Sequence, residues 1–208
     1  MLTSRYQPFF HRLLEGPARF LARWRVMPTT LTFLGLFLVG ASCLVLIRTR
    51  QLLLFCGLVM GASLCDALDG AVARASGRVT KQGAYLDALC DRYAEAAVVL
   101  SVAFVTGYWA LSSALLVGTM LVSYAKARAA LEAPVSNLEW PDLMERTERG
   151  AVYLAGLAGS QVVGWRPLGH ELFWWTLLVL SVLVHATVLQ RVIRAVGFIR
   201  QRGGRKLN

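Results

Sequence analysis

The chain has 208 residues, of which 56% are hydrophobic and 16% are charged, and its formal net charge is +10. This length suggests one domain, or at most two small ones, and the composition excludes an ordinary soluble globular protein. Uncharged stretches of about 20 residues are the signature of membrane-spanning helices. The basic residues lie at the edges of such stretches, which indicates lipid headgroups or anionic substrates as partners, and no nucleic acid.

The N-terminal segment, residues 1–26, is basic and partly apolar. Within residues 7–24, apolar side chains recur at helix-compatible spacing among Arg12, Arg19 and Arg23. We expect an amphipathic helix that lies on the cytoplasmic membrane surface. A basic, disordered tail is the alternative.

Six candidate membrane spans follow this segment. The uncharged run from Ala96 to Ala125 is too long for one span, so we divide it near Gly107. The predicted spans are residues 27–47, 51–76, 83–107, 108–131, 147–165 and 172–194. The chain is therefore predicted to be an all-α integral membrane protein, with a six-helix domain over residues 27–199 and a basic tail over residues 200–208.

The distribution of basic residues predicts the orientation of these spans. Eighteen Lys and Arg residues fall in the N-terminal segment, the second-to-third and fourth-to-fifth connections and the C-terminal end, against Arg48, Arg50 and Arg166 on the opposite side. Because basic residues are enriched in cytoplasmic loops, both termini are expected in the cytosol.

Four aspartates interrupt the apolar pattern at the end of the second span and the start of the third. Asp66 and Asp69 are spaced i, i+3, and Asp87 and Asp91 are spaced i, i+4, so each pair occupies one face of a helix. Charge within a membrane segment costs about 2.5–3.5 kcal/mol per residue on insertion scales. If the two helices pack antiparallel, four carboxylates converge near the cytoplasmic surface.

Four carboxylates at one place would repel one another unless a cation lies between them. Oxygen ligands are those that Mg²⁺, Mn²⁺ and Ca²⁺ prefer, and two metals held in this way could clamp a phosphoryl transfer. Gly70 and Arg74, further along the face of Asp66, have the character of a phosphate cradle. One alternative is a salt-bridged cluster with Arg74 and Arg92. Another is a cation- or proton-coupled transporter, although transporter sites usually lie at the bilayer midplane.

From Asp66 the sequence has the pattern D-x2-D-G-x2-A-R-x8-G-x3-D-x3-D, formed by Asp66, Asp69, Gly70, Ala73, Arg74, Gly83, Asp87 and Asp91. Eight fixed positions within 26 residues form a specific motif. It resembles the signature of the CDP-alcohol phosphotransferase (CDP-alcohol phosphatidyltransferase) family, whose six-span architecture also agrees with the predicted elements.

The resemblance implies a transferase of phospholipid biosynthesis, in which a CDP-linked lipid such as CDP-diacylglycerol donates a phosphatidyl group to an alcohol and CMP leaves. It implies that the four aspartates surround two divalent metals, Mg²⁺ or Mn²⁺, and that Asp91 is the general base. It also implies a CDP pocket formed by Thr32, Asp66, Asp69, Gly70, Ala73 and Arg74. Thr32 belongs to a second family feature, Pro-Asn-x-x-Thr, in which Thr29 here replaces the usual asparagine.

The acceptor is inferred from the inner basic residues. Lys126 and Arg128 end the fourth span, Arg146 and Arg149 open the fifth, and Arg191 and Arg194 end the sixth. These residues could bind the phosphate of a phosphorylated alcohol, and the family resemblance also implies this role for Lys126, Arg128, Arg191 and Arg194. The sequence around Lys126 resembles the inositol-phosphate branch of the family, except that Ala130 stands where that branch usually has glutamate. Phosphatidylglycerophosphate synthesis from glycerol-3-phosphate is the alternative. For all of these basic residues, the alternative is that they are ordinary basic flanks of membrane spans.

Small residues at 155–160 indicate close helix contact. Packing within one subunit and a dimer surface are both consistent with them, and the family resemblance also implies a homodimer. The expected location is the cell (inner) membrane, with the active site at its cytoplasmic face.

Overall fold

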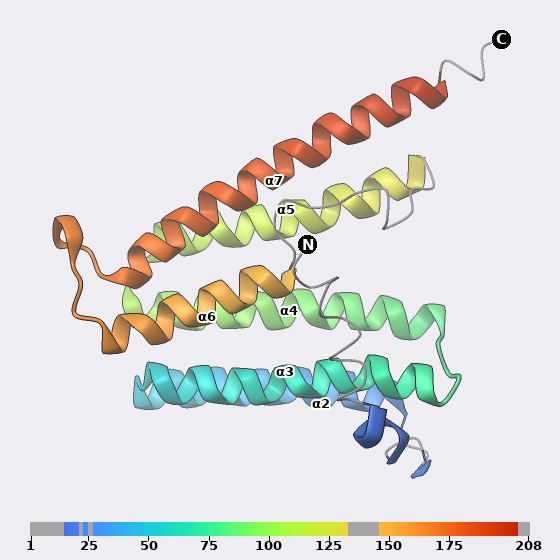
Figure 1. The fold of residues 1–208 in the computed structure, drawn as a ribbon, viewed down its shortest axis with the longest axis horizontal. Coiled ribbons are helices and arrows are strands. Elements are labelled where there is room, and N and C mark those ends of the chain that lie inside the picture. Colours follow the sequence, from blue (N-terminus) through green and yellow to red (C-terminus); the bar gives the residue numbers. More distant parts are fainter. Residues whose placement is uncertain (1–14, 21–22, 25–26, 133–145, 204–208) are drawn as a thin grey trace. The chain divides into compact units, whose positions relative to one another are not determined.

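The computed structural model describes residues 15–20, 23–24, 27–132 and 146–203. Within these ranges the chain is helical and contains no strand. The long helices are α2 (Pro28–Thr49), α3 (Leu52–Ala75), α4 (Lys81–Thr106), α5 (Trp109–Glu132), α6 (Arg146–Val162) and α7 (Leu172–Gly203), with a short 3-10 helix, η1 (Pro167–Gly169), before α7 (Figure 1). The prediction of an all-α protein is confirmed.

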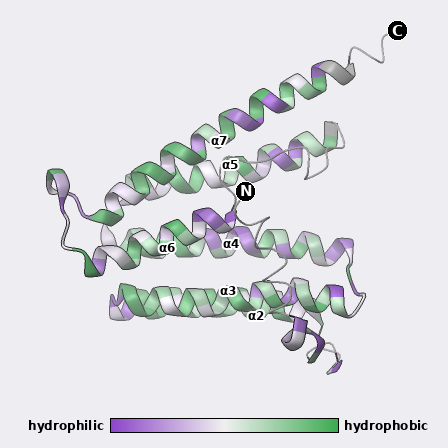
Figure 2. Cartoon of the chain, in the orientation of Figure 1, coloured by the Kyte–Doolittle hydropathy of each residue, from purple (hydrophilic) through white to green (hydrophobic). Residues whose placement is uncertain are grey.

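Four of the described helices are long and apolar enough to cross a membrane, namely α2, α3, α5 and α7. Figure 2 shows apolar residues along most of α2 and α3, whereas polar residues gather over the first part of α4 and the last part of α7. α6 has only 17 residues. The prediction of six spans therefore remains a prediction for α4 and α6.

The helix boundaries follow local sequence signals. The division near Gly107 is confirmed, because this residue ends α4 in a left-handed conformation with φ 78°, which glycine adopts without steric strain. The predicted second span, 51–76, matches α3 closely. The predicted last span ended at residue 194, but α7 continues to Gly203.

The chain divides into two compact units, which are described separately. In the first, α2 packs against both α3 and α4. Gly35 allows the close approach of α2 to α3, since a Cβ at this glycine would lie 3.6 Å from the Cβ of Cys65 and 3.9 Å from the backbone nitrogen of Asp66. α2 therefore approaches α3 directly beside the first aspartate.

Residues 15–20 form a short helix that belongs to the same unit. Ala18 is buried in a cluster with Leu31, Ala71 and Val72, while Phe20 is 60% exposed. Ala18 thus packs inward, whereas Arg19 and Glu15 are exposed and form an ion pair at 2.8 Å. The predicted position of this segment on the membrane surface stays a prediction. The remaining predicted positions, 7–14 and 21–22, lie outside the described residues.

The second unit contains α5, α6 and α7. Gly156 of α6 is buried, and a Cβ there would lie 2.7 Å from the Cβ of Thr176 on α7. A Cβ at Gly159 would lie 3.1 Å from a methyl carbon of Leu172. The two glycines of the small-residue stretch thus pack against α7 of the same chain.

Candidate metal and nucleotide site

The aspartate motif spans the end of α3, the connection 76–80 and the first half of α4. Gly77 has φ 65°, the left-handed region that favours glycine, and lets the chain reverse after α3. Thr80 then caps α4, because its side-chain oxygen accepts a hydrogen bond from the backbone N–H of Gly83 at 3.0 Å. This short reversal makes the two helices antiparallel neighbours and places the two aspartate pairs at the same end of the unit.

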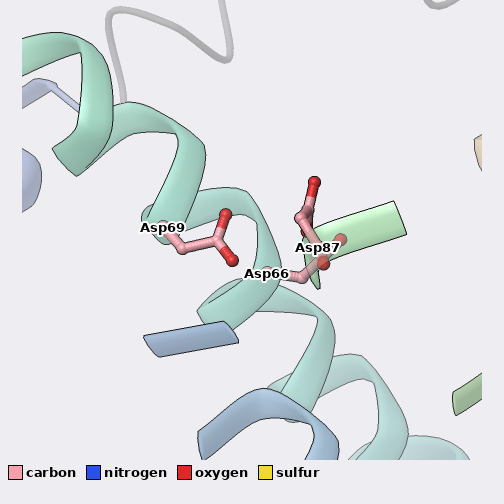
Figure 3. Close-up of side chains that lie close together, drawn as sticks. All are labelled: Asp66, Asp69 and Asp87. Atoms are coloured by element: carbon pink, nitrogen blue, oxygen red, sulfur yellow. The ribbon is translucent and has the colours of Figure 1, made fainter. Parts of the chain in front are cut away.

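Asp66, Asp69 and Asp87 converge as predicted. Each offers one carboxylate oxygen to a group whose ligand atoms all lie within 4.8 Å of one another. Figure 3 shows Asp66 and Asp69 on α3 beside Asp87 on α4, with their carboxylates directed into the same space. Asp69 is buried, Asp87 is half-buried and Asp66 is exposed, so the group opens to the outside of the unit at Asp66.

The donor set fits a hard divalent cation. In a six-coordinate Mg²⁺ with bonds of about 2.1 Å, adjacent ligand atoms are about 3.0 Å apart and opposite ones about 4.2 Å. The three carboxylate oxygens, all within 4.8 Å of one another, are close to this range. Without a cation, three carboxylates this close would repel one another strongly. The geometry therefore favours a metal centre built from two helices.

The fourth predicted ligand, Asp91, is not part of the group of three. It lies one turn after Asp87 on α4, is half-buried, and is near enough to Asp69 for the two carboxylates to interact electrostatically. The neighbouring Arg92 forms an ion pair with Glu95 at 2.9 Å. Asp91 thus lies beside the three converging carboxylates.

Thr32 contacts the aspartate group directly. Its hydroxyl donates a hydrogen bond to Oδ2 of Asp69 at 2.6 Å, and the side chains of both residues are buried. The next acceptor, the carbonyl oxygen of Pro28 in the same helix, is 3.3 Å away. The sequence predicted Thr32 as a nucleotide contact but did not predict this bond.

Gly70 and Arg74 lie together on α3, as the predicted phosphate cradle requires. A Cβ at Gly70 would lie 3.4 Å from Nη1 of Arg74, so the guanidinium folds back over the glycine backbone. Ala73 is half-buried on the same helix, and Arg74 is exposed. An anion that approached Gly70 would meet the N–H donors of this guanidinium.

The predicted acceptor residues belong to the second unit and differ in exposure. Lys126 and Arg128 on α5 are exposed, Arg194 on α7 is half-buried and Arg191 on α7 is buried. Arg191 donates a hydrogen bond through Nη1 to the backbone carbonyl of Val122 and so joins α7 to α5. At least one donor of Arg191 is therefore used within the protein.

Arg149 on α6, another of the inner basic residues considered for the acceptor phosphate, is only 4% exposed. Its position in the sequence, among other basic residues before a membrane span, did not distinguish it. A buried guanidinium is costly unless it is paired, so its burial marks it as more than a solvated basic flank.

A family comparison decides the class of the protein. Residues 25–184 match the model of the CDP-alcohol phosphatidyltransferase family. The chain belongs to this family. The match covers the aspartate motif and both units, and it favours the transferase over the transporter considered from the sequence.

Relatives within the family align over most of the chain. Archaetidylinositol phosphate synthase of Pyrococcus horikoshii is 30% identical, over 93% of this chain and 96% of its own length. Phosphatidylinositol phosphate synthase of Mycobacteroides abscessus is 35% identical, over 88% of this chain and 83% of its own length. An uncharacterized protein of Aquifex aeolicus is 37% identical, over 92% of this chain and 93% of its own length.

Solved structures agree with the sequence comparison. Phosphatidylinositol phosphate synthase of Mycobacterium tuberculosis with CDP-DAG bound matches with a TM-score of 0.75 and 30% identity, over 88% of this chain and 94% of that chain. The structure of the same enzyme with manganese and citrate matches with a TM-score of 0.76 and 29% identity, over 88% of both chains. The protein is thus an integral membrane transferase of the CDP-alcohol phosphatidyltransferase family, and its aspartate cluster is suited to a divalent metal.

Proposed function

We propose that the protein transfers a phosphatidyl group from CDP-diacylglycerol to an inositol phosphate and releases CMP. The observation that carries this proposal is the convergence of Asp66, Asp69 and Asp87 within 4.8 Å, in a chain whose family relatives include phosphatidylinositol phosphate synthases. A relative with CDP-DAG bound supports the donor.

The chain's own residues account for donor binding. Asp66, Asp69, Asp87 and Asp91 would hold two divalent ions, with Mg²⁺ as the natural ion and Mn²⁺ as a substitute. These ions would neutralise the diphosphate and stabilise the charge that develops on the leaving CMP. Gly70 lets the diphosphate approach the helix backbone, and the guanidinium that covers it supplies N–H donors to phosphate oxygens. Ala73 completes the proposed pocket, and Thr32 borders it through its hydrogen bond to Asp69.

The transfer needs a base beside the attacking oxygen, and we assign this role to Asp91. The hydroxyl oxygen of the acceptor attacks the phosphorus that carries the diacylglycerol. The bond from this phosphorus to the oxygen of CMP breaks, the electron pair leaves with CMP, and the acceptor proton passes to the Asp91 carboxylate. Asp91 is half-buried next to the three converging carboxylates, which suits a group that must face the acceptor while its neighbours bind the donor.

Basic residues of the second unit would bind the phosphate of the acceptor. We assign this role to Lys126, Arg128, Arg191 and Arg194, and we add Arg149 because its guanidinium is buried. A phosphomonoester carries more negative charge than a free alcohol, and the guanidinium group of arginine can donate two parallel hydrogen bonds to its oxygens. Glycerol-3-phosphate also carries such a group and is therefore the second candidate acceptor.

The reaction joins a lipid to a water-soluble acceptor, so we place the site at the cytoplasmic face of the cell membrane. In this proposal α4 and α6 also span the membrane, and both termini lie in the cytosol because basic residues concentrate there. A homodimer is also proposed. Its interface lies elsewhere than the face of α6 that carries Gly156, which packs against α7.

Release of CMP by the purified protein in detergent tests the proposed function. CDP-diacylglycerol and Mg²⁺ would be supplied with inositol-1-phosphate, glycerol-3-phosphate, inositol or serine in separate reactions. We expect release with inositol-1-phosphate and its loss in Asp91→Asn, because an amide cannot accept the proton. Release with glycerol-3-phosphate alone would replace the proposed acceptor, and no release with any of the four would contradict the assignment.

A further inference from the structure

The aspartate group includes one member, Asp69, whose carboxylate is held by a residue from a different helix. The hydroxyl of Thr32 on α2 donates to Oδ2 of Asp69 on α3 at 2.6 Å, and the two residues are only 8% and 7% exposed. Charge-assisted O–H···O⁻ bonds of this length are among the stronger protein hydrogen bonds. Water cannot easily replace a donor at such a buried position.

The packing of α2 on α3 explains why this bond has a fixed geometry. Thr32 and Gly35 are spaced i, i+3 and lie on one face of α2, opposite Asp69 and the backbone at Asp66. Because Gly35 has no side chain, the two helices meet closely one turn away from the bond. Val72, on the next turn of α3, is fully buried and belongs to the same buried cluster as Leu31. The donor and the acceptor therefore have little freedom to move apart.

We propose that Thr32 is a positioning residue for the metal centre, which acts by fixing the carboxylate of Asp69 so that it converges with Asp66 and Asp87. This inference rests on the proposed metal site and deepens it. A carboxylate ligand usually has such an outer hydrogen-bond partner, and loss of the partner typically weakens metal affinity by roughly 10–100-fold. Thr32 thus acts through Asp69, in contrast to the direct nucleotide contact that the family resemblance implies.

Two substitutions separate the hydroxyl from the volume of the side chain. Thr32→Val keeps the shape and removes the donor, whereas Thr32→Ser keeps the donor and removes a methyl group. Thr187→Val is the matched control, because Thr187 is 1% exposed and its hydroxyl donates only to Leu183 of its own helix among the bonds observed. If Thr32→Val does not fold, Thr32→Ala provides the same comparison with Thr32→Ser.

The readout is Mn²⁺ affinity of the purified protein in detergent without substrate, measured by the loss of the free-ion electron paramagnetic resonance signal. We expect Thr32→Val to weaken Mn²⁺ binding by roughly tenfold or more, and Thr32→Ser and Thr187→Val to bind as the wild type does. Unchanged Mn²⁺ affinity in a folded Thr32→Val variant would overturn the proposal. If Thr32→Val bound Mn²⁺ as the wild type does but needed a higher CDP concentration for the same thermal stabilisation, Thr32 would instead be a nucleotide contact.

The failure of the proposed metal site would look different. In that case the wild-type protein itself would bind no Mn²⁺, and Asp69→Asn would behave as the wild type does. Such a result would overturn the metal centre and, with it, the role of Thr32.

Discussion

Substitution of Gly156 tests the close contact between α6 and α7. Both helices belong to the same unit, and a Cβ at this glycine would lie 2.7 Å from the Cβ of Thr176 and closer still to its two γ atoms. Non-bonded carbon atoms are optimally separated by about 3.5–4.0 Å, so Gly156→Ala requires a relative movement of about 1 Å. Threonine is β-branched and stiff at χ1 in a helix, and its side chain cannot easily turn away.

Two opposing terms set the size of the effect. Overpacking of this kind costs about 1–3 kcal/mol, whereas alanine is favoured over glycine in a helix by about 0.8–1.0 kcal/mol. Gly150→Ala is the matched control, because Gly150 lies in the same helix, is exposed, and has no atom within 4 Å of the position of a Cβ. Both variants gain the same helix propensity from alanine. The difference between their free energies of unfolding therefore gives the cost of overpacking at Gly156.

Thermal unfolding in detergent measures this difference. At about 2–4 °C per kcal/mol, the Tm of Gly156→Ala should lie roughly 2–12 °C below that of Gly150→Ala. Equal Tm values would refute the contact between α6 and α7. A lowered dimer fraction at an unchanged Tm would instead indicate that Gly156 faces a second subunit.

Three further predictions concern the site. Arg74→Lys should raise the KM for CDP-diacylglycerol by about tenfold or more. Lysine cannot form the bidentate pair of hydrogen bonds that arginine forms with a phosphate, and a hydrogen bond to a charged group contributes about 1.5–3 kcal/mol. An unchanged KM would show that Arg74 is not part of the donor pocket. Chelation by EDTA should abolish CMP release and added Mn²⁺ should restore it, and activity that persists in EDTA would contradict the metal centre. Arg191→Met should lower the Tm, because it removes the bond from α7 to Val122 of α5, whereas Arg128→Met at an exposed position should raise only the KM for the acceptor. Equal Tm values for these two variants would show that Arg191 does not stabilise the fold.

The convergence of the aspartates was predictable because it depends on helical periodicity and one short reversal. Asp66 and Asp69 share a face of α3 by their spacing. The connection at 76–80 is short, and helices joined by such short connections usually run antiparallel to each other. The end of α4 at Gly107 was predictable for a similar reason, since glycine at the end of an apolar helix is a local signal. These features can be predicted from residues that are close to one another in the sequence.

Contacts between distant helices were not predictable in the same way. Thr32 and Asp69 are 37 positions apart, and Arg191 and Val122 are 69 apart. Periodicity indicates which face of a helix is buried, but it does not indicate which side chain of a neighbour that face meets. The small residues at 155–160 illustrate this limit, because their composition fitted both a subunit interior and a dimer surface until Gly156 was found against Thr176.

The central claim is that the protein makes a phosphatidylinositol phosphate, and the most direct measurement is the identity of the lipid product. Mass spectrometry of the lipid extract after reaction of the purified protein with CDP-diacylglycerol, Mg²⁺ and inositol-1-phosphate would identify it. We predict a lipid that contains both the phosphodiester to diacylglycerol and the phosphomonoester of the acceptor, formed in step with CMP and absent with Asp91→Asn. Formation of phosphatidylglycerophosphate when glycerol-3-phosphate is supplied, with no inositol lipid in the parallel reaction, would contradict the claim.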